Sequence, residues 1–263
     1  MDTYLIKIGG SVITDIRKQN AAKPDVITKI FNDIKPYMKD IRMVIGHGSG
    51  SFAHIPAHKY KVNLGIDASS TEGASITQDA AAQLHRVVVG CAVSAGVSPF
   101  SFVPSSGALS DAGKITAWDL SPMSKALELG FLPITYGDVV IDKSKGFSIA
   151  STEEVFRHIA KVLKPKKIII GTDVDGIFDS DPKVNKDARL IKEVNHKNIN
   201  EILNHAGSST KVDVTGGMKT KLEHLYDMSK QTGAVCQIIN LTAPKVLNDA
   251  MNGKKVGTEI KAF

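Results

Sequence analysis

The sequence D-V-T-G-G-M-K-T-K, from Asp213 to Lys221, places two adjacent glycines where a helix is expected to begin. Apolar residues then recur at three- and four-residue steps, and Gly233 marks the end of this helical pattern. Backbone N–H groups at a helix start have no intrahelical partner and carry partial positive charge, so a phosphate could bind at Gly217. Lys221 would add a full positive charge. Taken alone, however, the stretch is better explained as a glycine turn before an ordinary amphipathic helix.

A second strand-then-glycine pattern lies at the start of the chain. Residues 4–8 are apolar except for Lys7 and are followed by G-G-S, formed by Gly9, Gly10 and Ser11. This pattern predicts a buried strand that runs into a glycine turn. Because an unpaired buried charge is costly, Lys7 is either an edge-strand lysine that reaches water or a lysine directed at a phosphate.

The third such pattern is G-H-G-S-G-S-F-A-H, residues 46–54, which follows the apolar run at residues 43–45. Small residues between a strand and a helix form an anion-binding site, and His54 could donate a hydrogen bond to a phosphate oxygen. His47, His54 and His58 also raise the possibility of zinc. That alternative is weaker, because no cysteine or acidic residue is nearby and a proline separates the last two histidines.

The rest of the chain alternates apolar runs with amphipathic ones. We expect further helices at residues 24–34, 76–93, 121–130, 151–163, 199–204 and 244–251, further strands at residues 100–103, 132–136, 166–170 and 235–239, a hairpin over residues 139–149 and a final edge strand at residues 256–260. This alternation favours an α/β fold with a mainly parallel sheet and helices on both faces. Ligands of such sheets bind beyond the carboxyl ends of the strands, where the glycine turns fall.

Acidic residues occur at two of these strand and helix ends. Ser151 and Glu154 have the spacing of a capping box, in which each side chain bonds the other's backbone, whereas Glu153 is free to face lysines. In T-D-V-D-G, residues 172–176, the carboxylates of Asp173 and Asp175 could meet a ribose, a metal-bound nucleotide or only the turn itself. His85, inside the long helical pattern, is better explained as a structural residue than as a ligand.

Composition narrows the class of protein. With 263 residues, 42% hydrophobic and 23% charged, the chain is globular and forms one large α/β domain or two small ones. The net charge of +6 is mild and scattered, and aromatics are only 6%, so a nucleic-acid surface is the weaker interpretation. Cys91 and Cys236 lie in apolar surroundings, which favours buried reduced thiols. No apolar run approaches the ~20 residues of a membrane helix, and we expect a soluble cytoplasmic protein.

Five motifs together resemble the amino-acid-kinase superfamily along essentially the whole chain, and most closely its isopentenyl phosphate kinase branch. They are K-I-G-G-S-V-I-T (residues 7–14), H-G-S-G-S-F-A-H (47–54), Y-G-D-V (136–139), T-D-V-D-G (172–176) and D-V-T-G-G-M with Lys221. The resemblance implies a single three-layer α/β/α domain over residues 1–263, ATP with Mg²⁺, and a homodimer. Residues 1–164 would form the acceptor-binding lobe and residues 165–263 the nucleotide-binding lobe.

The resemblance also implies roles for individual residues. Lys7, His54, Lys221 and Glu153 would be catalytic; Lys7, Gly9, Gly10, Ser11, Gly50, Thr172, Asp173, Asp175, Gly217 and Lys221 would bind the nucleotide; and Ser49, Gly50, His54 and Gly137 would bind the acceptor. In this branch the histidine that corresponds to His54 goes with an acceptor that already carries a phosphate. Such an acceptor, with a second pKa of about 6, needs charge neutralisation rather than a general base.

Three segments depart from the family pattern. Ile16 stands where related kinases carry a lysine, for which Arg17 or Lys18 could substitute. The family's S-G-D segment is Ser151-Thr152-Glu153 here, and Ala53 replaces a glycine before His54. We therefore expect an isopentenyl phosphate kinase, with a fosfomycin-kinase-like or other small phosphate or phosphonate kinase as the alternative. A catalytically weakened nucleotide-binding regulator is a third hypothesis, which the changes at Ile16 and Thr152 allow.

Overall fold

The computed structural model describes residues 1–180, 185–206 and 217–263 of the chain. The first part of the D-V-T-G-G stretch, Asp213 to Gly216, therefore lies outside the described residues. Within the described part, no helix combines the length and the hydropathy needed to cross a membrane. Cys91 and Cys236 are both buried and free, as the sequence predicts.

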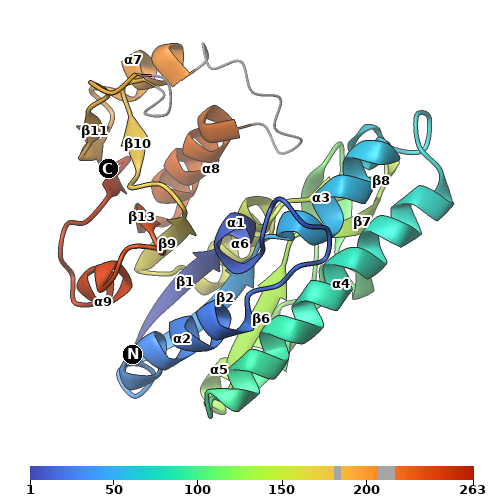
Figure 1. Cartoon of the computed structure of the whole chain (residues 1–263), viewed down its shortest axis with the longest axis horizontal. Helices are drawn as coiled ribbons and strands as arrows, with labels where there is room; N and C mark the ends of the chain where they lie inside the picture. The colour runs from blue at the N-terminus through green and yellow to red at the C-terminus, as the bar shows by residue number, and fades with distance from the viewer. Residues whose placement is uncertain (181–184, 207–216) are drawn as a thin grey trace.

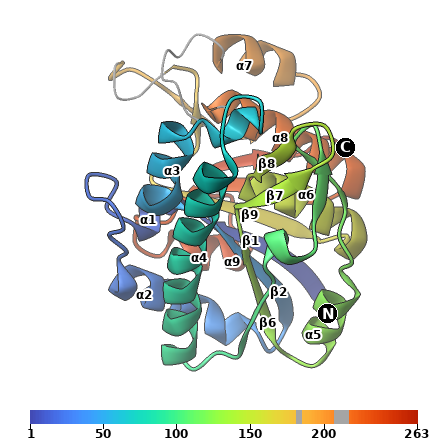
Figure 2. The same ribbon diagram turned by 90° about the vertical axis from the view of Figure 1, so that its right-hand side faces the viewer.

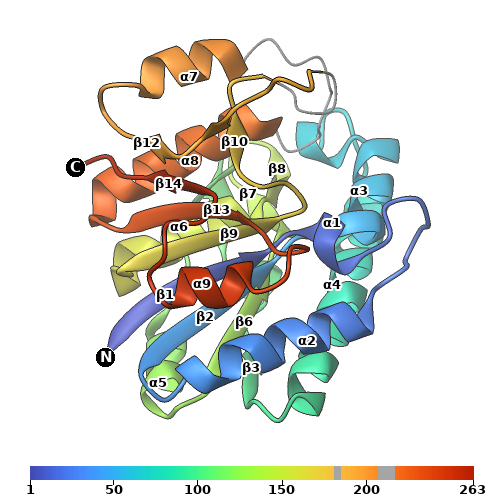
Figure 3. The ribbon, with the colours of Figure 1, turned by 60° about the vertical axis from the view of Figure 1, so that its left-hand side comes forward.

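A large twisted sheet forms the centre of the fold (Figure 3). Its strands in spatial order are β12 (Glu193–Val194), β14 (Thr258–Ile260), β13 (Val235–Asn240), β9 (Lys167–Thr172), β1 (Asp2–Ile8), β2 (Ile41–His47), β6 (Leu132–Tyr136) and β3 (Pro99–Ser101). The strands from β13 to β3 run parallel, and β14 is antiparallel to β13. The predicted mainly parallel sheet is thus confirmed.

One of the two interpretations of Lys7 is excluded, and one prediction about strand position is wrong. β1, which carries Lys7, lies between β2 and β9 in the middle of the sheet rather than at an edge. The final strand β14 is not an edge strand either, because β12 pairs with its outer side. β12 has only two residues, too few to show a strand pattern in the sequence.

Helices cover both faces of the sheet and bury one apolar cluster on each. On one face lie α5 (Ser121–Glu128), α6 (Thr152–Leu163), α7 (Ile199–Ala206) and α8 (Gly217–Thr232); on the other lie α2 (Pro24–Ile34), α4 (Thr71–Ser94) and α9 (Val246–Met251). Successive residues of β1 alternate between the clusters, with Leu5 in the first and Ile6 in the second. The long α4 stands in front of β6 in Figure 2. This is the three-layer α/β/α arrangement that the resemblance implies.

Smaller elements surround the sheet. They are α1 (Gly10–Ile13), α3 (Gly50–Lys59), the 3₁₀ turns η1 (Lys35–Tyr37), η2 (Val62–Leu64) and η3 (Pro104–Ser106), a four-stranded sheet of β5 (Lys114–Ala117), β4 (Leu109–Asp111), β7 (Asp138–Asp142) and β8 (Gly146–Ala150), and the pair β10 (Ile177–Phe178) and β11 (Leu190–Ile191). The hairpin predicted over residues 139–149 is β7 and β8. The strands β4 and β5 were not predicted from the sequence.

The parallel pairing brings four strand ends to the same edge of the large sheet (Figure 1). β1 ends at Ile8, β2 at His47, β6 at Tyr136 and β9 at Thr172. Each is followed by a residue of one of the predicted anion-binding or nucleotide-binding motifs. The register of the sheet therefore gathers motifs that are far apart in the chain.

The capping box at the start of α6 is only half formed. The Ser151 hydroxyl accepts the backbone N–H of Glu154 at 3.1 Å, as predicted. The Glu154 carboxylate does not reach back; it accepts the backbone N–H of Ile115 at 2.5 Å and is paired with Arg157 at 2.6 Å. The sequence could not show this, because the partner on β5 lies 39 positions away.

Asp142, at the end of β7, ties together the loops at one end of the smaller sheet. Its carboxylate, on a residue only 2% exposed, accepts five hydrogen bonds. The donors, at 2.7 to 3.1 Å, are the Ser110 hydroxyl and the backbone N–H groups of Ala112, Gly113, Ser144 and Lys145. Burial alone would raise the pKa of Asp142, but these hydrogen bonds outweigh it and hold the pKa below its usual range.

We expect Asp142→Asn to lower the free energy of unfolding by about 2 kcal/mol at pH 7, because an amide accepts these N–H groups less well than a carboxylate. A carboxyl whose pKa is lower in the folded state stabilises the fold above its unfolded pKa, near 3.9, and loses that effect as the pH falls. The difference between wild type and variant should therefore shrink below about pH 4. Urea unfolding measures both effects, and the exposed Asp40→Asn serves as the control. An equal loss at pH 7 and pH 3 would contradict the role of the charge.

Candidate active site

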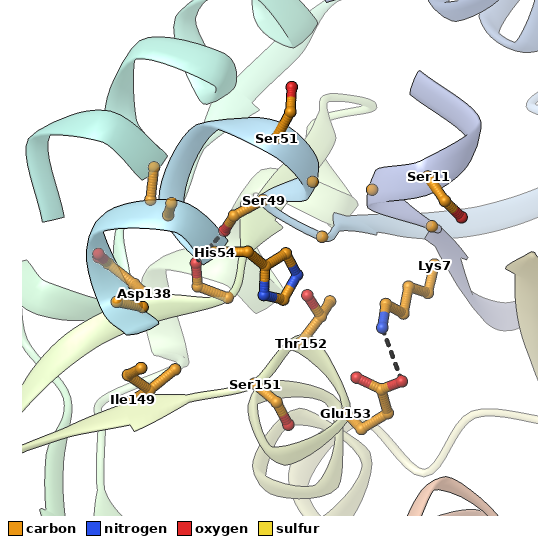
Figure 4. A pocket seen from close by; sticks show the side chains of 18 of the residues that line it. Lys7, Ser11, Ser49, Ser51, His54, Asp138, Ile149, Ser151, Thr152 and Glu153 are labelled. Carbon is orange, nitrogen blue, oxygen red and sulfur yellow. Dashed lines mark hydrogen bonds and ion pairs between the residues drawn. The ribbon is translucent and has the colours of Figure 1, made fainter. Parts of the chain in front are cut away.

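A cavity of about 480 Å³ lies where the carboxyl ends of the central strands meet the starts of α3 and α6. Figure 4 shows side chains from these elements pointing into it. It brings together nearly all the residues that the sequence predicts for the site: Lys7, Gly9, Gly10, Ser11, Ser49, Gly50, His54, Gly137, Glu153, Thr172, Asp173 and Lys221. Motifs from both ends of the chain thus contribute to one cavity.

Among the described residues, the predicted Asp175 does not line the cavity. The Asp175 carboxylate instead accepts a hydrogen bond from the Asn240 side-chain amide at 2.9 Å. Gly217 is the first residue of α8, and the residues before it lie outside the described part of the chain. Lys221, one turn further along α8, does line the cavity.

The glycine turns after β1 and β2 touch each other backbone to backbone. A Cβ atom at Gly10 would lie 2.3 Å from the backbone nitrogen of Gly50, and one at Gly48 would lie 2.9 Å from that of Gly10. Gly50 also has a φ of +48°, which side-chain-bearing residues rarely adopt. Only glycine fits these positions, and the starts of α1 and α3 are therefore adjacent at the edge of the cavity.

Lys7 and Glu153 form an ion pair at the floor of the cavity (Figure 4). The Lys7 Nζ lies 2.6 Å from the Glu153 Oε1, and the two side chains are 12% and 8% exposed. Burial would raise the pKa of Glu153, but the positive charges of Lys7 and Lys221 outweigh it and hold the pKa at about 2. Glu153 is therefore ionised, and it can hold Lys7 in place while offsetting part of the charge of both lysines.

Thr152, which stands where the family pattern has a glycine, is accommodated by its neighbours. Its hydroxyl donates to the backbone carbonyl of His47 at 2.7 Å. Its methyl group occupies space next to Gly46, where a Cβ would lie 2.6 Å from it. The larger residue thus adds a link between α6 and the end of β2, and Glu153 still faces the lysines.

His54 projects from α3 and points toward the centre of the cavity, on the side of Lys7 and Thr152 in Figure 4. Beside it, the Ser49 hydroxyl donates to the carbonyl of Gly137 at 3.2 Å, which links the second glycine turn to the end of β6. The cavity is also lined by the small or apolar side chains of Ala53, Ala57, Ala81, Val139 and Ile149 and by the polar ones of Thr77 and Asp138, none of which was singled out as a site residue from the sequence. The four-residue step from Ala53 to Ala57 on one helix was the available signal.

The position of the family lysine is filled by Ile16, which lines the mouth of the cavity and is 68% exposed. Arg17 does not replace the lysine in this structure. Its side chain is 84% exposed, and its Nε lies 3.0 Å from the Asp15 Oδ1. The pair lowers the pKa of Asp15, through the hydrogen bonds from Arg17, to about 2.

Comparison with known proteins shows the family of the chain. The model of the amino acid kinase family matches residues 2–240, and the chain belongs to this family. It is 33% identical to isopentenyl phosphate kinase of Methanothermobacter thermautotrophicus, over 97% of this chain and 98% of the relative. It is 31% identical to isopentenyl phosphate kinase of Thermoplasma acidophilum, over 98% of this chain and 99% of that relative. A crystal structure of isopentenyl phosphate kinase superposes with a TM-score of 0.83 at 29% identity, covering 98% of this chain and all of the other.

More distant structures share the fold. UMP kinase from Bacillus anthracis superposes with a TM-score of 0.68 at 18% identity, over 99% of this chain and 96% of that enzyme. Because the identity is low, this likeness supports the three-layer arrangement alone.

We expect Gly10→Ala to weaken ATP binding at least tenfold and to lower the free energy of unfolding by about 1–3 kcal/mol, because the added methyl group forces the two glycine turns apart. Titration calorimetry and urea unfolding measure these effects. Gly90→Ala is the matched control: Gly90 lies within α4 with no atom within 4 Å of the added Cβ. It should leave ATP binding unchanged and stabilise the fold by about 0.5–1 kcal/mol. Equal ATP affinities of the two variants would contradict the role of Gly10.

Proposed function

We propose that the protein is an ATP-dependent kinase that transfers a phosphoryl group to isopentenyl phosphate and so forms isopentenyl diphosphate. The observation that carries the proposal is the position of His54. It faces the cavity between a glycine turn suited to an anion and a wall of small and apolar side chains suited to a short hydrocarbon tail. The relatives at 30–33% identity over nearly the whole chain carry the name of this activity.

The charges of the site suit transfer between two anions. A phosphate monoester is already largely dianionic at neutral pH, so its attack on ATP is opposed by repulsion rather than by the lack of a base. Lys7 and Lys221 supply positive charge at the junction, and the backbone N–H groups of Gly10 and Gly50 supply dipoles. His54 would hold the phosphate of the acceptor and set its line of attack.

The nucleotide would bind at the ends of β1 and β9, in reach of the G-G-S turn, Thr172, Asp173 and Lys221. Among the described residues, no three His, Cys, Asp or Glu side chains cluster to hold a metal ion. This fits Mg²⁺, which is commonly held by phosphate oxygens and water with few protein ligands. When bound with ATP, Mg²⁺ would neutralise charge on the transferred phosphoryl group.

The proposal assigns the acceptor to residues 1–164 and the nucleotide to residues 165–263, which contribute adjoining halves of one sheet.

The proposal also includes a cytoplasmic homodimer. The edge strand β3 of the large sheet carries the exposed Phe100, and the centroid of its ring lies 5.4 Å from that of Phe131, edge to face. An open strand edge with apolar side chains suits contact with a second copy of the chain. Light scattering would report the mass in solution.

A panel of acceptors tests the proposal. We expect kcat/KM for isopentenyl phosphate to exceed that for fosfomycin or other small phosphate monoesters by at least tenfold, because the apolar wall favours a hydrocarbon tail. A coupled assay of ADP release measures each rate. Turnover of another acceptor without turnover of isopentenyl phosphate would reject the proposed substrate. ATP binding by calorimetry without any turnover would support the regulator instead.

His54→Ala should lower kcat/KM for isopentenyl phosphate about 100-fold, because a hydrogen bond to a charged group contributes about 1.5–3 kcal/mol. The KM for ATP should stay within twofold, since His54 lies on the acceptor side. Steady-state kinetics with each substrate varied in turn provides the measurement. His58→Ala is the matched control, because His58 is exposed one turn later on α3 and does not line the cavity. If both variants retain wild-type kinetics, His54 does not hold the acceptor.

A further inference from the structure

Two histidines with no role in the proposed mechanism lie buried behind the second glycine turn. His47 is the last residue of β2 and is fully buried, and His85 lies in α4 and is 6% exposed. Their rings stack with each other and with the ring of Tyr136, with centroids 4.4 to 5.4 Å apart. Packing of this kind needs no hydrogen bonds, yet every ring nitrogen of the two histidines has a polar neighbour.

These neighbours form a continuous chain of hydrogen bonds. The Nδ1 of His47 lies 3.3 Å from the carbonyl oxygen of Gly48, and its Nε2 lies 3.0 Å from the Nδ1 of His85. The Nε2 of His85 lies 2.9 Å from the hydroxyl of Ser101, an exposed residue on β3. The chain thus runs from the edge strand of the sheet to the glycine turn at the cavity.

The direction of each bond follows from the Gly48 carbonyl, which can only accept. The Nδ1 of His47 must therefore donate, and in a neutral imidazole its Nε2 then accepts. The Nδ1 of His85 must then donate to the Nε2 of His47. In a neutral His85 ring the Nε2 accepts, and its donor is the Ser101 hydroxyl. Both histidines are assigned the Nδ1–H tautomer.

The surroundings keep both rings neutral. Burial, with a smaller contribution from the positive charge of Lys7 and from His85, lowers the pKa of His47 to about 3. Burial also lowers the pKa of His85 to about 4. The carboxylate of Asp138 acts on Tyr136, the third ring of the stack, and itself accepts hydrogen bonds from the backbone N–H groups of Ser105 and Val139.

The Gly48 carbonyl matters because it belongs to the same peptide unit as the N–H of Ser49. In a trans peptide these two groups point in opposite directions, so holding the carbonyl fixes the N–H. Ser49 is the residue before the first turn of α3, where backbone N–H groups are available to an anion. On the other side, the His47 carbonyl is held by the hydroxyl of Thr152 and the N–H of Gly137, so both ends of His47 are fixed.

We propose that His85 and His47, joined in this order to the Gly48 carbonyl, orient the Gly48–Ser49 peptide toward the phosphate of the acceptor, which makes His85 a positioning residue for phosphoryl transfer. The inference rests on the proposed function for the identity of the acceptor. The hydrogen-bond chain itself does not depend on that identity, and the two are therefore tested separately.

Nitrogen-15 NMR of the imidazoles tests the chain without any turnover. We expect His47 and His85 to show a protonated Nδ1 and an unprotonated Nε2, unchanged between pH 5 and pH 8. His85→Asn should leave the His47 tautomer as it is, because an Asn side-chain amide can donate from the place of Nδ1. An Nε2–H tautomer of either histidine, or protonation of either ring in this range, would overturn the proposal even if the kinase activity is confirmed.

Kinetics then tests the role in positioning. His85→Leu, which fills the space without a donor, should raise the KM for isopentenyl phosphate about tenfold and leave the KM for ATP within twofold. His85→Asn should recover most of this loss, whereas a purely structural role would leave the Asn variant no better than the Leu variant. If His85→Leu fails to fold, as judged by thermal unfolding, Ser101→Ala on the exposed strand should raise the acceptor KM two- to threefold. The inference would be overturned if His85→Leu raised the KM for ATP as much as the KM for isopentenyl phosphate. It would also be overturned if neither His85→Leu nor Ser101→Ala raised the KM for isopentenyl phosphate.

If the wild-type protein does not phosphorylate isopentenyl phosphate, the proposed function fails and the positioning role is measured with inorganic phosphate. The same variants should then weaken phosphate binding in the same order, His85→Leu more than His85→Asn, as titration calorimetry reports. Equal phosphate affinities of wild type and both variants would overturn the inference independently of the substrate.

Discussion

The contact between the two glycine turns is the constraint on which the rest of the site depends. The backbone of Gly10 lies so close to Gly50 that no side chain fits between them. This contact is possible because β1 and β2 pair in parallel with Ile8 opposite His47, so that both strands end at the same level. The starts of α1 and α3 are then adjacent at the edge of the cavity. The apolar layers on the two faces of the sheet hold this register.

A second constraint is the balance of charge around Glu153. The site brings Lys7 and Lys221, 214 positions apart, close to the same carboxylate. Two ammonium groups at the edge of a core would repel each other, and the ionised carboxylate reduces that repulsion. Lys7, Lys221 and Glu153 together carry one net positive charge, and the carboxylates of Asp138 and Asp173 also line the cavity. Glu153 retains this function although α6 begins with Thr152 rather than the glycine of the family pattern, because Gly46 leaves room for the threonine methyl group.

The sequence predicts the parts of this structure that depend on local pattern. Strand-then-glycine motifs identified the turns at Gly9 and Gly50, and helical periodicity identified α2, α6 and α8. The rest depends on pairing between distant segments. The central place of Lys7 in the sheet, the bond from Ile115 to Glu154 and the contact of His47 with His85 each join residues from 38 to 163 positions apart. Strands of two to four residues such as β5 and β12 carry too little periodicity to be recognised.

The replacement of the family lysine by Ile16 removes one positive charge from the lining of the cavity. Arg17 is turned toward Asp15, so this segment brings no guanidinium over the cavity in its place. Under the proposed function, the neutralisation of the acceptor phosphate would fall on His54, on the amide groups of the second glycine turn and on Lys7. Amide dipoles act over a short range and only when they are well oriented, whereas a lysine tolerates several positions. A site that relies on them needs a fixed turn, and the buried hydrogen bonds of His47 supply that rigidity from behind.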